Sequence, residues 1–446
     1  MNLLPHDGLA LASLEEQFLQ PGVKGLPITE PLRQGAIGVQ GWNVLRADTS
    51  FPVAVLKHSA LSHNLDWMKR FCERHGAILA PHGKTTMSPQ LFGAQLDNGA
   101  WGITLASATQ VQVAHRFGVR RVLLANQLVA RADIASMLGL LHGDPDFELF
   151  ILVDSSEGVA RLAAAVAAHP LSRPLPLLVE LGLTGKRAGC RSDAAALALA
   201  HEVAQTPGLQ LAGFEGYEGL QVTDDRVADV AAVNAFLARL VALTRQADAA
   251  RLFMGRRDIL ISAGGSGYFD LVARGFDQLR DLSRPVLPIL RSGCYLTSDH
   301  GSYLRQIGEL DAREAAHCDQ CGDVGHGLQP ALQVWSMVQS RPEPDLAILT
   351  MGKRDASYDI ELPLPILTHR PGRPGAPSSL PPGAVIFKMN DQHAYLRLPP
   401  GHEDLLAVGD LIGCGISHPC TTFDKWPLLL AVDDDYTVQY AINTFF

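Results

Sequence analysis

A lysine and a histidine stand close together in a turn of small residues early in the chain. Residues 81–86 read P-H-G-K-T-T and directly follow the short apolar run 77–80. The amine of Lys84 could form a Schiff base with an aldehyde, and His82 could move protons beside it. A lysine after a strand is commonly only a solvated side chain, so the spacing alone leaves its role open.

A glycine-rich stretch follows another apolar run, at 258–262. It consists of Gly264, Gly265, Ser266, Gly267 and Tyr268. Glycines let backbone N–H groups approach a phosphate, and the serine adds a hydroxyl donor, although a tight turn that needs positive φ explains the stretch equally well. A phosphate site on the same rim as a lysine suggests pyridoxal phosphate (PLP), whose aldehyde forms a Schiff base with a lysine amine.

His418 and Cys420 are two residues apart in the segment S-H-P-C-T-T. In an extended segment such residues point to the same face, so one metal ion could bind the imidazole nitrogen and the thiolate together. Two protein ligands would leave coordination positions open for a substrate oxygen. A buried cysteine beside a histidine is the alternative interpretation.

A second group of possible metal ligands is a single C-x-x-C motif. It comprises Cys318 and Cys321, with His317 just before them and His326 beyond. Structural zinc normally takes four protein ligands, and no second C-x-x-C completes this set. A surface loop with free thiols is therefore the favoured interpretation.

The central part of the chain alternates apolar, β-prone runs with segments of helical spacing. The predicted strands are 53–56, 77–80, 102–105, 121–125, 147–153, 175–181, 209–214 and 258–262. Eight such units predict a (β/α)8 barrel, because no G-x-G-x-x-G follows the first run, as it would in a dinucleotide-binding sheet. Segments 59–74 and 227–246 predict the clearest amphipathic helices. Catalytic groups of such a barrel lie at the carboxyl ends of its strands.

After residue 288 the pattern changes to short apolar runs broken by Pro and Gly, which predicts antiparallel strands. These runs are 384–388, 394–398, 410–416, 428–432 and 438–442. Segment 368–382, rich in Pro, Gly and Ser, predicts an exposed loop. We therefore expect a (β/α)8 TIM-type barrel followed by a mainly antiparallel β domain. The predicted domains are an N-terminal extension that packs on the β domain (1–50), a PLP-binding barrel (51–288) and a β domain with the metal site (289–446).

Composition narrows the functional class. The 446 residues carry a formal net charge of -9 without any run of basic residues, which excludes nucleic acid as an expected partner. The start of the chain lacks the pattern of a signal peptide, and no stretch approaches the roughly 20 apolar residues of a membrane span. Seven scattered cysteines argue against a secreted disulfide framework. We expect a cytoplasmic protein with no membrane partner.

Several motifs taken together resemble one enzyme family. They are P-H-x-K-T at 81–85, a V-E-x-x-x-T-G-x-R-x-G stretch at 179–189, the loop 264–268, R-S-G-C-Y at 291–295, N-D-Q-H at 390–393 and the H-x-C pair. With these the chain resembles the fold-type III PLP enzymes of the D-serine dehydratase and D-threonine aldolase group, distant relatives of alanine racemase. The resemblance spans most of the chain.

The resemblance implies roles for individual residues. Lys84 would be the Schiff-base lysine, and residues 264–268 would hold the cofactor phosphate. Arg187 would approach the phenolic oxygen of the cofactor, and Tyr217 would line its pyridine ring. His418 and Cys420 match the metal pair of the family, which implies zinc or another divalent metal.

The implied activity is a dehydratase that converts a D-β-hydroxy amino acid, such as D-serine or D-threonine, into a 2-oxo acid and ammonia. The alternative is retro-aldol cleavage to glycine and an aldehyde, for which His82 or His393 would be the base. The thiolate of H-x-C favours the dehydratase, because the resemblance links this motif with dehydratases. An amino-acid racemase and a non-catalytic PLP-binding protein are further alternatives, and the family implies a homodimer.

Two departures from the family pattern concern the substrate. Thr86 stands where members commonly have a histidine after the lysine motif, and residues 391–393 read D-Q-H in place of E-E-H. The resemblance therefore implies the cofactor chemistry more firmly than the identity of the substrate.

Overall fold

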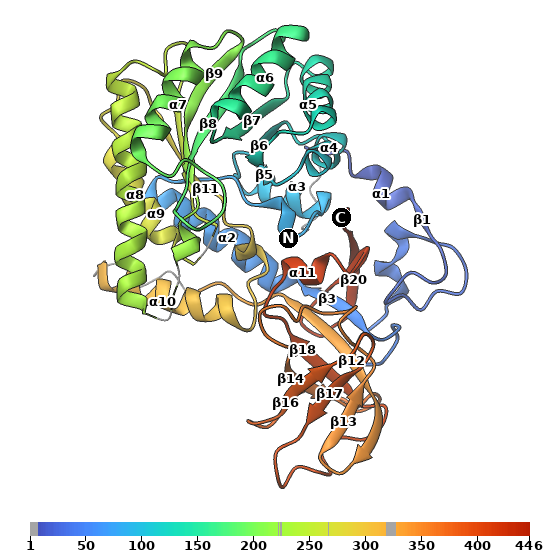
Figure 1. Cartoon of the computed structure of the whole chain (residues 1–446). Helices are drawn as coiled ribbons and strands as arrows, with labels where there is room; N and C mark the ends of the chain where they lie inside the picture. The colour runs from blue at the N-terminus through green and yellow to red at the C-terminus, as the bar shows by residue number, and fades with distance from the viewer. Residues whose placement is uncertain (1–7, 222, 224, 266, 318–326) are drawn as a thin grey trace. The chain divides into compact units, whose positions relative to one another are not determined.

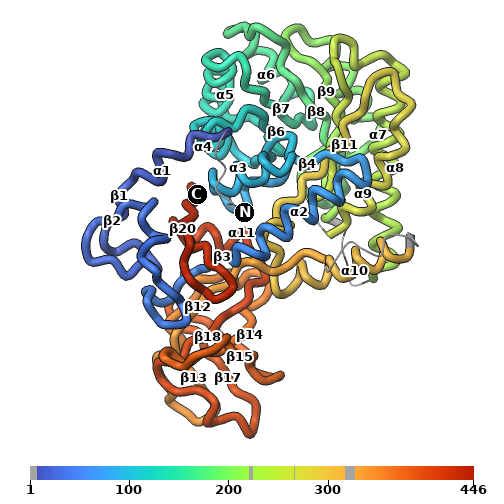
Figure 2. The backbone as a smooth tube through the Cα atoms, turned by 180° about the vertical axis from the view of Figure 1, so that it is seen from behind, coloured from blue at the N-terminus to red at the C-terminus, as the bar shows by residue number. Residues whose placement is uncertain are grey.

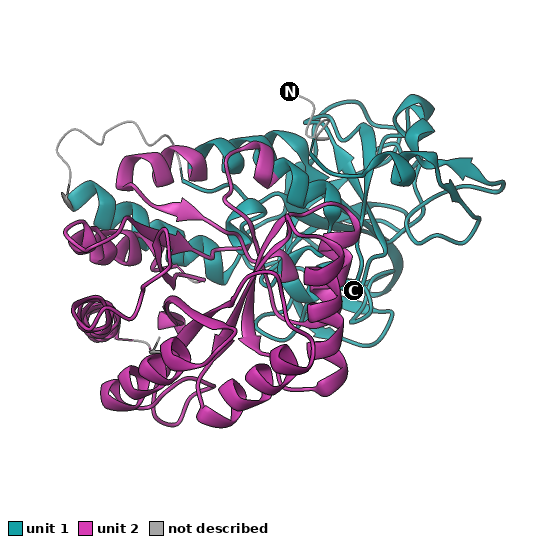
Figure 3. Ribbon diagram, turned by 90° about the horizontal axis from the view of Figure 1, so that it is seen from above, with its two compact units in different colours: residues 1–67, 85–94, 294–446 teal, residues 68–84, 95–293 magenta. Residues whose placement is uncertain are grey.

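A computed structural model describes residues 8–221, 223, 225–265, 267–317 and 327–446. The chain forms two compact units, coloured separately in Figure 3. Unit 1 consists of Met1–Trp67, Thr85–Ala94 and Cys294–Phe446, and unit 2 of Met68–Lys84 and Gln95–Gly293.

Unit 2 is built on eight parallel strands in the order β4-β11-β10-β9-β8-β7-β6-β5. The strands are β4 (Ile78–Leu79), β5 (Ile103–Leu105), β6 (Arg121–Gln127), β7 (Glu148–Val153), β8 (Leu175–Leu181), β9 (Leu209–Gly216), β10 (Ile259–Ala263) and β11 (Val286–Leu290). A parallel bridge between His82 and Thr104 links the two ends of this path, and the Thr104 N–H donates to the Pro81 carbonyl at 2.9 Å. The sheet is thus closed into a barrel, which confirms the predicted fold class.

Helices follow the barrel strands and cover the outside of the sheet (Figure 1). They are α4 (Ala108–Arg116), α5 (Arg131–Gly143), α6 (Ser156–Ala168), α7 (Asp193–Gln205), α8 (Arg226–Ala249) and α9 (Phe269–Phe276). The hydroxyls of Ser107, Ser155 and Ser192 cap the amino ends of α4, α6 and α7 by accepting backbone N–H groups of the first turn. Short polar residues in the sequence therefore set where these helices begin.

Helix α8 is long and apolar enough to span a membrane by length and composition alone, whereas the sequence indicated no such stretch. This is weak evidence, because core helices of soluble proteins pass the same test. Its side chains at Val233, Phe236, Leu237 and Leu240 are buried, and the helix packs against α7, α9 and β9. The apolar composition of α8 thus fits a helix of the barrel layer.

The prediction that 53–56 is the first barrel strand is wrong. Strand β3 (Val53–Lys57) pairs with β12 (Leu332–Glu343) antiparallel and with β19 (Leu428–Val432) parallel, far from it in the sequence. Figure 2 shows the blue β3 beside the red C-terminal strands of unit 1. The eighth barrel strand is β11, whose Pro288 weakens its strand pattern. Lys84 therefore follows the first barrel strand, Tyr217 the sixth and the glycine-rich loop the seventh.

Unit 1 contains a ten-stranded, mainly antiparallel sheet. Its other strands are β13 (Leu346–Leu349), β14 (Leu364–His369), β15 (Ser378–Ser379), β16 (Val385–Met389), β17 (Ala394–Arg397), β18 (Leu411–Gly415) and β20 (Val438–Asn443). Strands β1 (Phe18–Leu19) and β2 (Leu32–Arg33) form a separate small sheet. The other α-helices of the described residues are α1 (Ala12–Glu16), α2 (His58–His75), α3 (Pro89–Asp97), α10 (Ser302–His317) and α11 (Cys420–Phe423). All five predicted C-terminal runs are strands. The predicted loop 368–382 is only partly a loop, because it includes the end of β14 and the short strand β15 that pairs with it.

Residues of the N-terminal segment belong to the hydrophobic core of unit 1. Ile37 and Val44 are fully buried in one cluster with Val55, Trp335 and Leu411. Apolar surface that is removed from water stabilises the folded chain by about 25 cal/mol per Å², and this gain holds the N-terminal segment against the sheet. The N-terminal segment therefore packs against strand β3 and against sheet residues that come much later in the chain.

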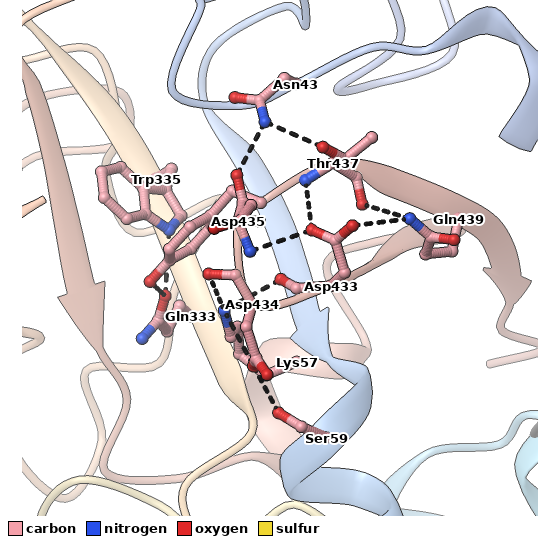
Figure 4. Close-up of polar contacts among 11 residues, drawn as sticks. Asn43, Lys57, Ser59, Gln333, Trp335, Asp433, Asp434, Asp435, Thr437 and Gln439 are labelled. Atoms are coloured by element: carbon pink, nitrogen blue, oxygen red, sulfur yellow. Dashed lines mark hydrogen bonds and ion pairs between the residues drawn. The ribbon is translucent and has the colours of Figure 1, made fainter. Parts of the chain in front are cut away.

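Hydrogen bonds at the β19–β20 turn add to this attachment (Figure 4). The Asp433 carboxylate accepts the N–H groups of Asp435 and Thr437 at 3.0 and 2.8 Å. Lys57, at the end of β3, donates to the Asp433 carbonyl at 2.9 Å, and Asn43 donates to the Asp435 carbonyl at 2.7 Å. The turn thereby joins three distant parts of unit 1.

A glycine inside the barrel gives a direct test of this strand arrangement. Gly213 on β9 pairs with Leu260 on β10, and a Cβ at position 213 would overlap the Leu260 carbonyl oxygen. We expect Gly213→Ala to lower the free energy of unfolding by about 3 kcal/mol, because the strands must move apart. Gly139→Ala, in open space on helix α5, should raise it by about 0.5–1 kcal/mol. Urea unfolding of both variants measures the contrast, and equal effects would contradict the arrangement.

Candidate functional site

The turn after β4 carries the predicted lysine and histidine of unit 2. Lys84 lies in a single 3-10 turn (Gly83–Thr85), and both its side chain and that of His82 are half-buried. Desolvation and the nearby cations of Lys84 and Arg291 lower the pKa of His82 well below its usual value. Among the described residues the His82 Nδ1 atom has no hydrogen-bond partner. His82 is therefore a neutral imidazole at pH 7 and a weak base.

A buried ion pair joins the ends of two other barrel strands. Arg291, directly after β11, pairs with Glu215 on β9 and also donates to the Gly216 carbonyl at 2.8 Å. Desolvation raises the pKa of Glu215 to about 8, although Arg291 opposes the shift. The Glu180 carboxylate nearby adds to the rise. The pair fixes β9 against β11 at the carboxyl ends of the strands.

The start of the glycine-rich loop is held by hydrogen bonds from both sides. The Gly264 N–H donates to the buried Glu218 carboxylate at 2.8 Å. The Gly264 carbonyl accepts the Arg291 N–H at 2.8 Å and the Ser292 hydroxyl at 3.2 Å. Gly264 has φ 87°, which few other residues adopt without strain. The loop is thus fixed at its first residue, while Ser266, a predicted phosphate-binding residue, lies outside the described residues.

Tyr217 brings the glycine-rich loop and the loop after β8 together. The Arg187 guanidinium lies 4.8 Å from the centre of the Tyr217 ring, within the range of a cation–π interaction. On the other loop, a Cβ at Gly265 would lie 3.1 Å from the same ring. A glycine at 265 therefore lets the backbone approach Tyr217 closely. The ring is half-buried at the end of β9.

These features of unit 2 fit PLP. An amine, a guanidinium and an aromatic ring lie at the carboxyl ends of barrel strands, where a barrel carries its catalytic groups. At Gly265 the close approach to Tyr217 leaves little room for a side chain, so the loop presents backbone there. Tyr268 is buried directly before α9, so the loop leads into the amino end of a helix, a favourable place for a phosphate. The predicted cofactor residues that are described thus share one unit.

His418 and Cys420, the predicted metal ligands, lie in unit 1 between β18 and β19. Cys420 begins helix α11, so the prediction of an extended segment is wrong at this point. The two side chains nevertheless interact: their hydrogen bond is the main cause that raises the pKa of His418 to about 9. Hydrogen bonds from Cys294 and His418 hold the pKa of Cys420 well below its usual value. The side chains of His418 and Cys420 are therefore in contact with each other.

Two further side chains surround Cys420. The sulfur of Cys294 lies 3.8 Å from that of Cys420, and the Thr85 hydroxyl lies 3.3 Å from it. Thr85 is the residue after Lys84 in the sequence. Thr85 belongs to the P-H-x-K-T motif and Cys294 to the R-S-G-C-Y motif, but the sequence predicted no role for either residue. The thiol of Cys420 is thus in contact with parts of unit 1 that come from three regions of the chain.

The donors at His418 and Cys420 fit zinc, which takes imidazole nitrogen and thiolate sulfur at about 2.0–2.3 Å. No group of three or more His, Cys, Asp or Glu side chains that could hold a metal ion occurs among the described residues. A metal bound by His418 and Cys420 alone would have two protein ligands and open coordination positions.

The remaining predicted candidates lie elsewhere. His393 is exposed in the turn between β16 and β17 of unit 1, so the structure does not bring it together with His82 within one unit. His317 is the last residue of α10, and Cys318, Cys321 and His326 lie outside the described residues.

Family comparisons agree with this division of the chain. The alanine racemase N-terminal domain family matches residues 56–280, which include seven of the eight barrel strands, and the serine dehydratase domain family matches residues 331–432. The first match covers half of the chain.

Individual relatives match nearly the whole chain. A D-threonine aldolase from Arthrobacter sp. is 25% identical over 422 residues, 93% of this chain and 95% of the relative. The D-threo-3-hydroxyaspartate dehydratase of Delftia sp. (strain HT23) is 24% identical over 410 residues, 89% of this chain and 97% of the relative. The crystal structure of D-threonine aldolase from Filomicrobium marinum has a TM-score of 0.70 at 23% identity and covers 89% of this chain and 96% of its own.

The match to the alanine racemase N-terminal domain lies on the barrel that carries Lys84 and the glycine-rich loop, and the serine dehydratase match lies on the sheet that carries His418 and Cys420. The chain therefore belongs to the fold-type III PLP enzymes, with an alanine racemase N-terminal domain followed by a serine dehydratase domain.

Proposed function

We propose that this protein is a PLP- and zinc-dependent dehydratase of D-β-hydroxy amino acids, which releases a 2-oxo acid and ammonia. The observation that carries the proposal is the contact between the imidazole of His418 and the thiol of Cys420, which are two donor types that zinc takes. Structures of D-threo-3-hydroxyaspartate dehydratase mutants have been solved in which a histidine, or a cysteine two residues further on, is replaced by alanine, the latter in a metal-free form. The same spacing in this chain supports a metal pair.

Lys84 has the central role in this proposal. PLP, when bound, accepts the electron pair that remains at Cα after a proton leaves. The Lys84 amine would hold the cofactor as a Schiff base and then remove the α-proton of the substrate. Arg187 would bind the phenolic oxygen, Tyr217 would line the ring, and the loop at Gly264, Gly265, Ser266, Gly267 and Tyr268 would hold the phosphate.

His418 and Cys420 would hold zinc in this proposal. Zinc, when bound, supplies a Lewis acid for the β-hydroxyl, which is otherwise a poor leaving group. Two protein ligands leave coordination positions for that oxygen. The other side chains around Cys420, those of Thr85 and Cys294, would keep its sulfur in place.

D-Threonine aldolase activity is the second candidate, and the Arthrobacter relative supports it. Retro-aldol cleavage needs a base that removes the proton of the β-hydroxyl. His82 is poorly suited to this role because its pKa is far below its usual value. His393 is exposed in the other unit. The properties of these two histidines therefore favour dehydration.

The proposal also includes a cytoplasmic location and a homodimer, as in the family. A racemase would need no metal, and neither would a non-catalytic PLP-binding protein, so the His418 and Cys420 pair argues against both. The small-molecule substrate would be a D-amino acid, and we expect neither nucleic acid nor membrane as a partner.

D-Threonine separates the two leading reactions because it can enter both. We expect the PLP- and zinc-loaded protein to release 2-oxobutyrate and ammonia, detected by mass spectrometry and an ammonia assay, with Lys84→Ala as the inactive control. Glycine and acetaldehyde would instead identify an aldolase and overturn the dehydratase proposal.

A further inference from the structure

A short segment of unit 1, residues 357–361, runs beside the segment that carries the proposed metal ligands. At one end the Ser357 N–H donates to the Thr422 hydroxyl at 3.0 Å. At the other end the Glu361 N–H donates to the Ser417 hydroxyl at 3.2 Å, and this hydroxyl donates back to the Glu361 carbonyl at 2.8 Å. Both ends of segment 357–361 are therefore fixed through backbone atoms.

Asp359 lies between these two anchors and faces the proposed ligands. One oxygen of its carboxylate, Oδ2, lies 2.6 Å from Nδ1 of His418. The other, Oδ1, accepts the Thr421 hydroxyl at 2.8 Å. The Asp359 side chain stays 44% exposed, so these two hydrogen bonds, and not burial, hold its carboxylate in place. The carboxylate of Asp359 thus contacts the histidine with one oxygen and is held by Thr421 through the other.

The contact determines which nitrogen of His418 can bind a metal. An ionised carboxylate only accepts hydrogen bonds, so the nitrogen that faces it must carry the hydrogen. Nδ1 is therefore the donor to Asp359, and Nε2, once it has lost its proton to allow metal binding, is the nitrogen that can offer a lone pair. A carboxylate that holds a ligand histidine in this way fixes the ring orientation and raises the basicity of the metal-binding nitrogen.

We propose that Asp359 is the positioning residue of the metal site: it holds His418 with Nε2 directed at the metal that Cys420 also binds. This inference rests on the proposed function, because it presupposes zinc at His418 and Cys420. It adds a third residue to the site, one whose role is to orient a ligand without binding the metal itself. The Thr421 hydroxyl fixes the second oxygen of Asp359 in turn.

The test measures zinc affinity rather than activity. Full-length, PLP-loaded protein is freed of metal and titrated with zinc in competition with a chromophoric chelator. We expect Asp359→Asn to weaken zinc binding by about 10- to 100-fold, because the amide no longer provides the negative charge that holds the Nδ1 hydrogen. Asp359→Glu keeps the carboxylate and should recover part of the affinity.

Glu361→Gln is the matched control. It removes one carboxylate from the same segment, where Glu361 pairs with the exposed Arg305 at 2.5 Å, and leaves the backbone contacts to Ser417 unchanged. Its zinc affinity should stay within twofold of the unsubstituted protein. Melting temperatures of the metal-free proteins identify any loss of fold.

The outcomes separate the inference from the function on which it rests. Zinc bound tightly by the unsubstituted protein and equally tightly by Asp359→Asn would overturn the role of Asp359 alone. Equal losses in Asp359→Asn and Glu361→Gln would also overturn it, because they would reflect only the charge of the segment. Absence of zinc binding in the unsubstituted protein would refute the metal site and, with it, this inference.

Discussion

Lys84→Ala is expected to lower kcat/KM for D-threonine by about 10⁴-fold or more and to release PLP from the protein on dialysis. The amine has two roles in the proposed reaction, the covalent attachment of the cofactor and the removal of the α-proton. Loss of a positioned base alone typically costs about 10²- to 10⁴-fold, and loss of the covalent attachment adds to it. Product formation and the visible absorption of the dialysed protein measure the two effects separately.

Lys186→Ala serves as the control for this variant. Lys186 is an exposed lysine in the loop after β8, next to Arg187. Its replacement removes the same charge near the same barrel end and should change kcat/KM by less than about threefold, because an exposed charge is screened by solvent. If Lys84→Ala kept its PLP and its activity, the assignment of the Schiff-base lysine would be wrong.

Local patterns in the sequence predicted most of the barrel because each β and α element has its own periodicity. They did not show which sheet a strand joins. The run at β3 is apolar throughout and precedes helix α2, like a barrel unit, yet its pairing partners β12 and β19 come more than 270 residues later. Strand β11 was missed because Pro288 lies at its centre, where proline is uncommon. The sheet to which a strand belongs therefore depends on pairing between distant segments, which the periodicity of the sequence does not reveal.

The same distinction applies to the candidate site. Lys84, the glycine-rich loop and the H-x-C pair lie in short contiguous motifs, so their residue types could be recognised together. Asp359 reaches His418 across 59 positions, and Cys294 reaches Cys420 across 126. A single aspartate without a spacing pattern carries no signal in one sequence, and the R-S-G-C-Y motif that contains Cys294 has no spacing that links it to Cys420. Residues that orient or surround the ligands therefore became apparent only when the chain was folded.

Cys420→Ala is expected to remove zinc and to lower kcat for D-threonine dehydration by about 10²- to 10⁴-fold. Lewis-acid assistance to a leaving oxygen is worth several kcal/mol, and each 1.36 kcal/mol corresponds to a factor of ten in rate. The PLP absorption of the variant should stay intact, because the cofactor residues belong to unit 2. Metal analysis of the purified protein and single-substrate kinetics measure the two losses.

A second thiol shows whether the effect is specific to Cys420. Cys72 is a buried thiol of helix α2, and burial raises its pKa to about 12, so it stays protonated at neutral pH. Cys72→Ala should therefore keep its zinc and its kcat, although it can lower the melting temperature. Removal of zinc from the unsubstituted protein with a chelator should reproduce the kinetics of Cys420→Ala. Added zinc should then restore the activity of the unsubstituted protein but not that of the variant. Full activity of Cys420→Ala without zinc would show that the hydroxyl leaves without a metal, and the catalytic groups would then have to be sought among the barrel residues alone.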